Sequence, residues 1–262
     1  MGERIAKPRL FLSGMDGQAS ELAAQQGLGL ELTDFTWAVM LDTPDAVEKA
    51  RKKMQGISRF WLHAPFAELI PCAIDPKVRE VAMSRFRQTV RTAEALGIRH
   101  IVFHAGFIPW VYFPEWFVPQ SVAFWKELLA EMPQDMTAAL ENVMEPGPEM
   151  LVKIAEGVDD RRLGLCLDVG HACSEVSRTA PEDWITPMRP FLRHVHLHSN
   201  FGSADLHLPL GEGSLPANRI LDRLLRETDA TLTLENQNCA ASLTWLQVNG
   251  YLEENHDGTG TL

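Results

Sequence analysis

The sequence predicts a single (β/α)8 barrel. Eight short apolar runs follow one another along the 262-residue chain, and longer stretches with helical spacing separate them. Barrels of this class commonly reach this length as one domain. No Ser/Gly-rich linker and no change in composition marks a second domain. We therefore expect a barrel over residues 1–252 and a flexible tail over residues 253–262.

Each apolar run has the length and composition of a buried parallel strand. In order, the runs are RLFLSG (9–14), LGLELTDF (28–35), RFWLHAPF (59–66), RHIVFHAGF (99–107), MTAALENV (136–143), LGLCLDVGHA (163–172), RHVHLHSN (193–200) and TLTLENQ (231–237). The stretch 75–97 shows the intervening helical pattern, since Asp75 can cap a helix, Pro76 can begin it and Gly97 can end it. This alternation predicts eight strand–helix units.

Charge and composition exclude several classes of protein. The formal net charge of -11 argues against non-specific attraction to nucleic acids or to anionic membranes. No stretch is apolar for long enough to form a signal peptide or a membrane span. The four cysteines stand far apart without a CxxC pair, which suits a reducing compartment. We expect a cytoplasmic protein with no membrane partner.

Strand parity directs several ionisable residues to one end of the barrel. In LGLCLDVG, the three leucines share one parity and Asp168 has the other. Alternate side chains of a barrel strand point to the helices or to the interior, and active sites form at the carboxyl ends of the strands. Six inward ionisable residues are expected at this end: His63, His104, Glu141, Asp168, His196 and Glu235.

Three further residues that can bind metals follow the strand ends in loops, namely His171, Asp205 and His207. The whole set holds five imidazoles and four carboxylates. Such a mixture suits zinc, or alternatively manganese, because carboxylates can bridge two cations and neutral imidazoles complete the ligand shell. Nine ligands exceed what one ion can use. The set therefore predicts two or three divalent metal ions per chain.

The order of these residues resembles the xylose-isomerase-like barrels, and among them the AP endonuclease family 2 pattern. The resemblance runs across nearly the whole chain through LHAPF, VFHAG, LEN, LDVGHA, VHLH, DLH and a second LEN. It implies one ion on His63, His104 and Glu141, a second on Glu141, Asp168, His196 and Glu235, and a third on His171, Asp205 and His207.

The resemblance implies two different chemistries. In phosphodiester hydrolases, clustered cations generate hydroxide near neutral pH and stabilise the attacking and leaving oxygens. The DxH at residues 205 and 207 favours this branch, with Glu141 or Glu235 positioning the nucleophile and His171 helping to hold the ion at the leaving oxygen. The alternative is a sugar or sugar-phosphate isomerase or epimerase that uses Glu141 and Glu235 as an acid–base pair. A binding protein that retains metal without turnover is a third class.

The loop after the fourth run indicates the kind of substrate. Over HAGFIPWVYFPEWFVPQSVAFW it has no Lys or Arg, whereas duplex binding normally draws on several basic contacts to phosphates. The loop therefore argues against DNA. Its aromatic residues, among them Trp110, Tyr112 and Trp116, are expected to contact a compact phosphorylated small molecule.

The remaining histidines have simpler interpretations. His100 and His194 share the inward parity but lie lower in their strands, so we expect hydrogen-bonded core residues. His198 follows His196 on the same face, where it can orient a ligand residue or contact substrate, and the orienting role is favoured. His256, in the tail, is expected to be solvated.

Overall fold

A computed structural model describes residues 3–253, and the barrel prediction is confirmed. Eight parallel strands form a closed ring in chain order, with β8 hydrogen-bonded to β1. The strands are β1 (Leu10–Ser13), β2 (Gly29–Leu32), β3 (Phe60–His63), β4 (His100–His104), β5 (Thr137–Glu141), β6 (Leu163–Asp168), β7 (Leu192–Leu197) and β8 (Thr231–Leu234). Each strand overlaps one of the eight apolar runs, which shows that continuous apolar character identified them correctly.

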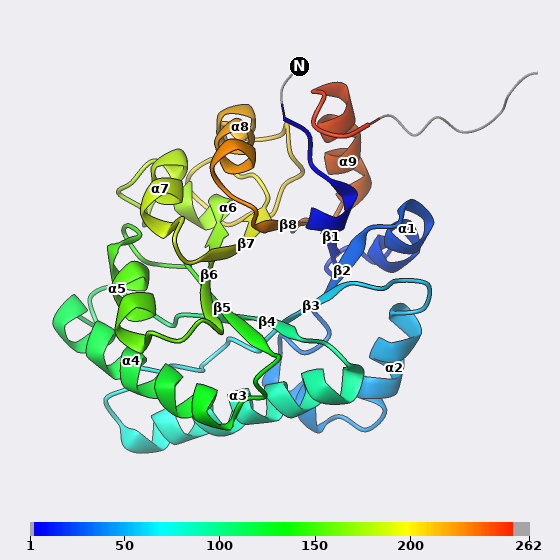
Figure 1. Ribbon diagram of the computed structural model, residues 1–262. Helices are drawn as coiled ribbons and strands as arrows, with labels where there is room; N and C mark the ends of the chain where they lie inside the picture. The colour runs from blue at the N-terminus through cyan, green and yellow to red at the C-terminus, as the bar shows by residue number, and fades with distance from the viewer. Residues whose placement is uncertain (1–2, 254–262) are drawn as a thin grey trace, which may run out of the picture.

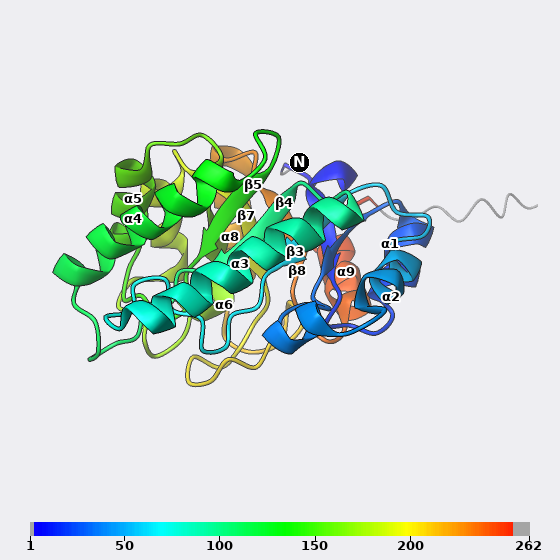
Figure 2. The ribbon, with the colours of Figure 1, turned by 90° about the horizontal axis from the view of Figure 1, so that it is seen from below.

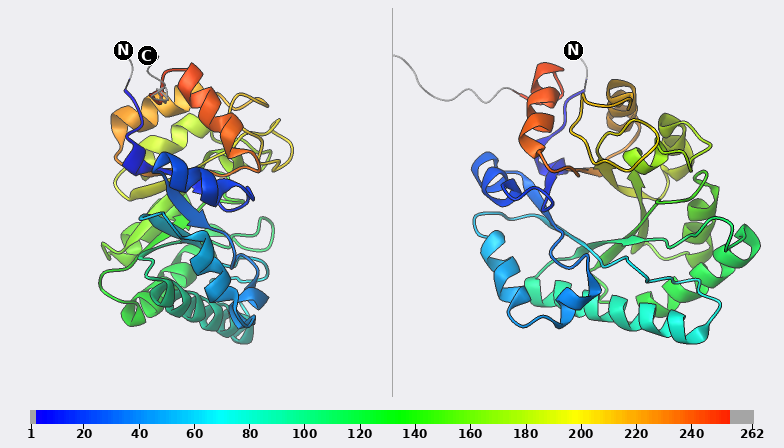
Figure 3. Two further views of the ribbon diagram at one scale, coloured as in Figure 1. Left: turned by 90° about the vertical axis from the view of Figure 1, so that its right-hand side faces the viewer. Right: turned by 180° about the vertical axis from the view of Figure 1, so that it is seen from behind.

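Helices surround the ring of strands (Figures 1 and 3). They are α1 (Ala19–Gln26), α2 (Ala46–Lys53), α3 (Pro76–Leu96), α4 (Pro114–Glu131), α5 (Glu149–Val158), α6 (Val169–Ala172), α7 (Ile185–Met188), α8 (Ala217–Glu227) and α9 (Cys239–Val248), with 3-10 helices η1 (Lys7–Arg9), η2 (Ala38–Asp42) and η3 (Pro181–Trp184). Asp75 caps α3 by accepting from the Lys77 amide, and Gly97 ends it with a φ of 74°. Figure 2 shows α3 and α4 side by side on the outside.

Two apolar layers lie on the two faces of the strands. The outward residues, such as Leu163 and Leu165 of β6, belong to the large core between the strands and the helices. A smaller cluster shares the inward parity and fills the lower interior: Phe11, Trp61, Val102, Ala139 and Cys166. The interior is therefore apolar toward the amino ends of the strands, and this floor supports the polar residues above it.

The cysteines serve as packing residues. Cys72, Cys166 and Cys239 are buried, Cys173 is partly buried, and all four are free thiols. Within residues 3–253, no helix combines the length and the apolar character needed to cross a lipid bilayer. His256 and all but the first residue of the predicted tail lie outside the described residues, so the tail stays a prediction.

Candidate metal centre

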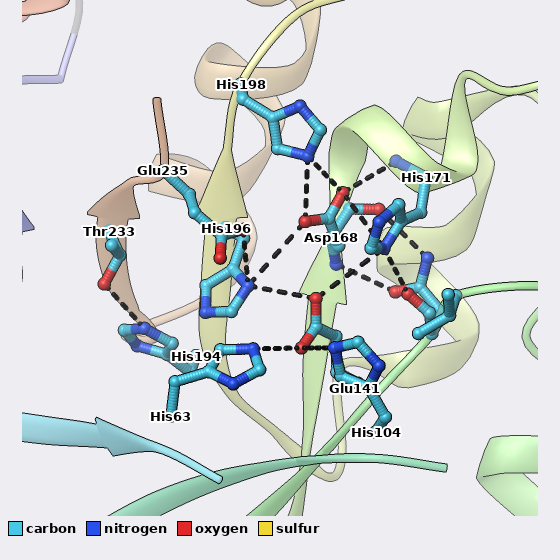
Figure 4. A network of polar contacts seen from close by, with 12 residues as sticks. His63, His104, Glu141, Asp168, His171, His194, His196, His198, Thr233 and Glu235 are labelled. Carbon is cyan, nitrogen blue, oxygen red and sulfur yellow. Dashed lines mark hydrogen bonds and ion pairs between the residues drawn. The ribbon is translucent and has the colours of Figure 1, made fainter. Parts of the chain in front are cut away.

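The strand ends bring the six inward residues together at the carboxyl end of the barrel. Neighbouring strands align His104 with Glu141 and Asp168 with His196. The long loop after β7 projects from the barrel, drawn in yellow in Figure 2, and brings two of the three loop ligands. Figure 4 shows the side chains pointing toward one another around Glu141 and Asp168.

The first group of potential ligands consists of His63, His104 and Glu141. Nε2 of His63 lies 3.3 Å from Glu141 Oε2, and Nε2 of His104 lies 3.4 Å from the same oxygen. Nδ1 of His63 donates to the carbonyl oxygen of Ala64 at 2.8 Å, which leaves Nε2 free to face the carboxylate. Burial lowers the pKa of His104 to about 3, so its ring is neutral near pH 7, as a ligand must be.

The second group shares Glu141 with the first and adds Asp168, His196 and Glu235. Nδ1 of His196 lies 3.1 Å from Glu141 Oε1 and 3.0 Å from Glu235 Oε2. Oδ2 of Asp168 is 3.7 Å from the same nitrogen. Burial would raise the pKa of Glu141, but His196 and His104 hold it well below the usual range, so the carboxylate is ionised.

Unpartnered oxygens show that these two groups suit a divalent cation. Among the described residues, Oε2 of Glu141 and Oε2 of Glu235 are buried and accept no hydrogen bond, although imidazole nitrogens lie 3.0 to 3.4 Å away. Buried carboxylate oxygens are rarely left in this state, because desolvation without compensation is costly. Three carboxylates and three imidazoles around such oxygens match the ligand types of zinc and manganese.

The third group brings together Asp205 and His207, which lie in the loop after β7 as predicted, and His171, which lies in the short helix α6 and not in a loop. Nε2 of His171 lies 3.2 Å, and Nε2 of His207 lies 3.0 Å, from Asp205 Oδ2. Nδ1 of His171 donates to the Asn142 carbonyl oxygen, and Nδ1 of His207 donates to that of Glu235, both at 2.9 Å. The backbone thereby turns both Nε2 atoms toward the same carboxylate. This geometry suits a further cation.

His198 is fully buried and lies close enough to His171, Asp205 and His207 to be a fourth possible ligand of this group. Its Nε2 is 3.0 Å from both oxygens of Asp168, and its ring stacks on His207 with centroids 4.0 Å apart. The contacts suit the orienting role that the sequence favoured. A direct contact between His198 and substrate stays a prediction, and the ring does not line the cavity described below.

Sequence reasoning missed Glu31, which is buried beneath the second group. Its Oε1 accepts from Nε2 of His196 at 3.0 Å, so Nδ1 of His196 is left to face the other carboxylates. Its Oε2 accepts from Thr233 Oγ1 at 2.6 Å and lies 3.0 Å from Nε2 of His194. The inward parity of Glu31 between two leucines was the available signal, but the residue is not at the strand end.

The two lower histidines have different outcomes. His194 is a buried core residue as expected, with Nδ1 2.6 Å from Thr231 Oγ1 and its ring stacked on Trp61. The core expectation for His100 was wrong, because this first residue of β4 is exposed at the amino end of the barrel. Its Nδ1 lies 2.8 Å from Thr137 Oγ1.

A cavity of about 590 Å³ opens above the ligand residues. Seven of them line it: His63, His104, Glu141, His171, Asp205, His207 and Glu235. The rest of its lining is mainly apolar and includes Met15, Trp37, Phe66, Leu69, Ile70, Phe107, Ile108, Val143 and Met144. The carboxyl end of the barrel thus combines a polar wall of possible metal ligands with an apolar wall.

The three aromatic residues predicted to contact substrate are not among the lining residues. Trp110 is 89% exposed, Tyr112 is buried in the outer core, and Nε1 of Trp116 donates to the Cys72 carbonyl oxygen. Of the same loop, Phe107 and Ile108 reach the cavity. A substrate contact by these three residues stays a prediction that the geometry does not support.

The fold and the site define a metal-binding barrel with its polar centre at the carboxyl ends of the strands. Residues 22–248 match the family described as xylose isomerase-like TIM barrel, the AP endonuclease 2 family. The chain belongs to this family, as its ligand pattern suggested.

Relatives with similar sequences include an uncharacterized protein of Methanocaldococcus jannaschii, which is 28% identical over 191 residues, or 68% of this chain and 64% of that protein. A probable endonuclease 4 of Shouchella clausii is 28% identical over 168 residues, which cover 59% of this chain and 56% of that protein. The chain therefore spans less than two thirds of the length of either relative.

Solved structures with the same fold include a D-tagatose 3-epimerase-like protein, with a TM-score of 0.76, 22% identity and coverage of 94% of this chain and 97% of that one. A Thermus thermophilus protein soaked with zinc chloride has a TM-score of 0.72 and 27% identity, and the match covers 93% and 97% of the two chains. Several solved structures with this fold are named as epimerases, among them a D-psicose 3-epimerase and a 3-keto-D-glucoside 4-epimerase, and at 16% and 13% identity they show that the fold is shared.

Proposed function

We propose that the protein is a metal-dependent hydrolase of a small-molecule phosphodiester. The third group, His171, Asp205 and His207, is the observation that carries this proposal. An isomerase that moves a proton next to a carbonyl needs one divalent ion and has no evident use for a third set of ligands. Cleavage of a phosphodiester has a use for it, because charge develops on both the attacking and the leaving oxygens.

The three groups are contiguous and would hold their cations close to one another, since Nδ1 of His171 lies 3.6 Å from Oε1 of Glu141. Glu141 belongs to the first and second groups, and Glu235 lies between the second and third, 3.0 Å from His196 Nδ1 and 4.0 Å from His207 Nδ1. When bound, clustered divalent cations lower the pKa of water and neutralise charge on a phosphoester. Zinc is the first candidate by ligand type, and manganese the second.

The protein's own residues would then orient the reactants. Oε2 of Glu235 accepts no hydrogen bond and Glu235 lines the cavity, so this oxygen can accept a hydrogen bond from the attacking water and hold its proton. Glu141 fixes the spacing of the first two groups. His171, held by the Asn142 carbonyl oxygen, fixes the side on which the leaving oxygen would lie.

The charge of the cavity favours a small substrate over DNA. No lysine or arginine is among the described residues that line it. A nucleic acid would place further phosphates against this surface without a cationic partner. A compact diester would place its single negative charge beside the cations that the ligand residues would hold.

A sugar or sugar-phosphate epimerase is the second candidate. Glu141 and Glu235 approach the same His196 nitrogen from two sides, as an acid–base pair sharing one cation would. The D-tagatose 3-epimerase-like structure and its relatives favour this alternative by analogy of fold alone.

One variant separates the two candidates. His207→Ala should remove one ion per chain and lower the hydrolysis of bis(4-nitrophenyl) phosphate by at least about 100-fold, because transition-state stabilisation at the leaving oxygen is lost. Elemental analysis and initial rates measure both effects. A single ion in the wild type, unchanged in His207→Ala together with activity, would contradict the hydrolase proposal. Epimerisation of a ketose without diester cleavage would support the alternative.

A further inference from the structure

The apolar wall of the cavity is built by residues that follow β2 and β3. Trp37 precedes η2 and Phe66 follows β3, and their ring centroids lie 6.3 Å apart at an interplanar angle of 39°. Trp37 is 61% exposed and Phe66 is 36% exposed, although both rings are large and apolar. Paired aromatic rings that line a cavity yet stay open to solvent are typical of a ligand-binding surface.

This apolar wall lies against the first group of possible metal ligands. The ring of Phe66 stacks on His104 with centroids 4.4 Å apart, and its edge meets His63 at 5.8 Å. Both histidines belong to the first group. Glu141 separates these two histidines from the third group: its Oε2 faces His63 and His104, and its Oε1 lies 3.6 Å from Nδ1 of His171. A phosphodiester with its leaving oxygen at the third group would therefore direct its other ester group toward Trp37 and Phe66.

The apolar character and the charge of this wall indicate which ester groups could bind there. Met15 and Ile70 also line the cavity, and apart from the possible metal ligands Glu68 is the one charged residue among the described lining residues. A carboxylate with no lysine or arginine among the lining residues disfavours a second phosphate or carboxylate on the substrate. Aromatic rings favour an uncharged ring, which they contact by offset stacking or edge to face.

We propose that Trp37 and Phe66 form a subsite for a neutral aromatic ring on the ester group that stays bound to phosphorus. The inference rests on the proposed hydrolase function and names its substrate class. Water would add its oxygen to phosphorus as the bond from phosphorus to the leaving oxygen breaks. One proton of the water goes to the leaving oxygen, so the products are an alcohol and an aryl phosphomonoester.

Two diesters with one leaving group test the subsite. Phenyl 4-nitrophenyl phosphate should exceed methyl 4-nitrophenyl phosphate in kcat/KM by at least about tenfold, after correction for their uncatalysed rates. Trp37→Ala and Phe66→Ala should each reduce this preference severalfold. Phe113→Ala is the matched control, since this ring is exposed but does not line the cavity, and it should keep the preference.

A binding measurement separates the subsite from the catalytic proposal. Phenyl methylphosphonate and methyl methylphosphonate carry a stable carbon–phosphorus bond in place of the leaving oxygen, and calorimetry with zinc-loaded protein measures both. Stronger binding of the phenyl compound that is lost in Trp37→Ala, without cleavage of any diester, would support the subsite and overturn the hydrolase. Diester cleavage with equal kcat/KM for both substrates, unchanged in Trp37→Ala, would overturn the subsite and leave the hydrolase standing. No cleavage and no preference in binding would overturn both.

Discussion

Two histidines of β7 show how depth inside the barrel decides a residue's role. His194 and His196 point inward from the same strand, both are fully buried, and each approaches one oxygen of Glu31 at 3.0 Å. Two residues farther along the strand, His196 presents Nδ1 to Glu141 and Glu235. His194 instead lies on the aromatic floor.

The surroundings of the two histidines shift their pKa values in opposite directions. Burial against Trp61 and between threonines lowers the pKa of His194 to about 4, so its ring stays neutral and packs. Burial would also lower the pKa of His196, but Cys166 and the nearby carboxylates, Glu235 first among them, raise it well above the usual value. A proton or another cation is favoured beside His196 and disfavoured beside His194. Within one layer of side chains, the barrel interior therefore changes from a packed core to a group of possible metal ligands.

The largest expected effect separates these two histidines. His196→Ala should remove the ion of the second group and reduce diester hydrolysis by at least about 1000-fold, because the remaining carboxylates repel one another. His194→Ala should keep the metal content and lower the thermal midpoint instead, because it leaves a cavity beneath Glu31. Elemental analysis and thermal unfolding of both variants check this contrast. Equal metal loss in the two variants would break it.

The next effect concerns the carboxylate that the two histidines share. Glu31→Gln should weaken binding of the second ion by about 10- to 100-fold, as expected when the partner that orients a metal-binding histidine is lost. Competition with a zinc chelator measures the affinity, and nitrogen NMR of His196 reports whether its proton stays on Nε2. Thr233→Val, which removes a hydroxyl that contacts Glu31 and His194 but not His196, is the matched control and should cost less. Unaltered affinity and an unaltered proton position in Glu31→Gln would exclude a positioning role.

A smaller effect concerns stability and pH. Burial raises the pKa of Glu145 to about 7, against a usual value of 4.5. The folded state thus holds this proton more tightly than the unfolded state. The contribution to stability is complete below pH 4.5 and is lost as pH rises through about 7, up to about 3 kcal/mol.

Glu145→Gln tests this contribution, because it should flatten the fall in unfolding free energy between about pH 5 and about pH 8. Denaturant unfolding of the metal-free protein at the two pH values gives the comparison. An equally steep fall in variant and wild type would show that other groups cause it.

Much of the architecture could be predicted because its signals are local. Continuous apolar runs marked all eight strands, and parity with strand ends placed residues such as Asp168 and His196 at one mouth. Glu31 was missed because a carboxylate in mid-strand gains its meaning from residues on other strands, such as His196, which is 165 positions away. The apolar wall was missed for the same reason. Trp37 and Phe66 meet only after β2 and β3 pair, whereas the conspicuous Trp110 is exposed to solvent.

We propose that the mouth of this barrel holds metal ions at three groups of ligands, the third made by His171, Asp205 and His207. Anomalous diffraction at the zinc edge, from crystals grown with zinc, tests it most directly. We predict three peaks, one at each group, with Glu141 beside two of them. A single peak among Glu141, Asp168, His196 and Glu235, with none at the third group, would contradict the account and favour the epimerase.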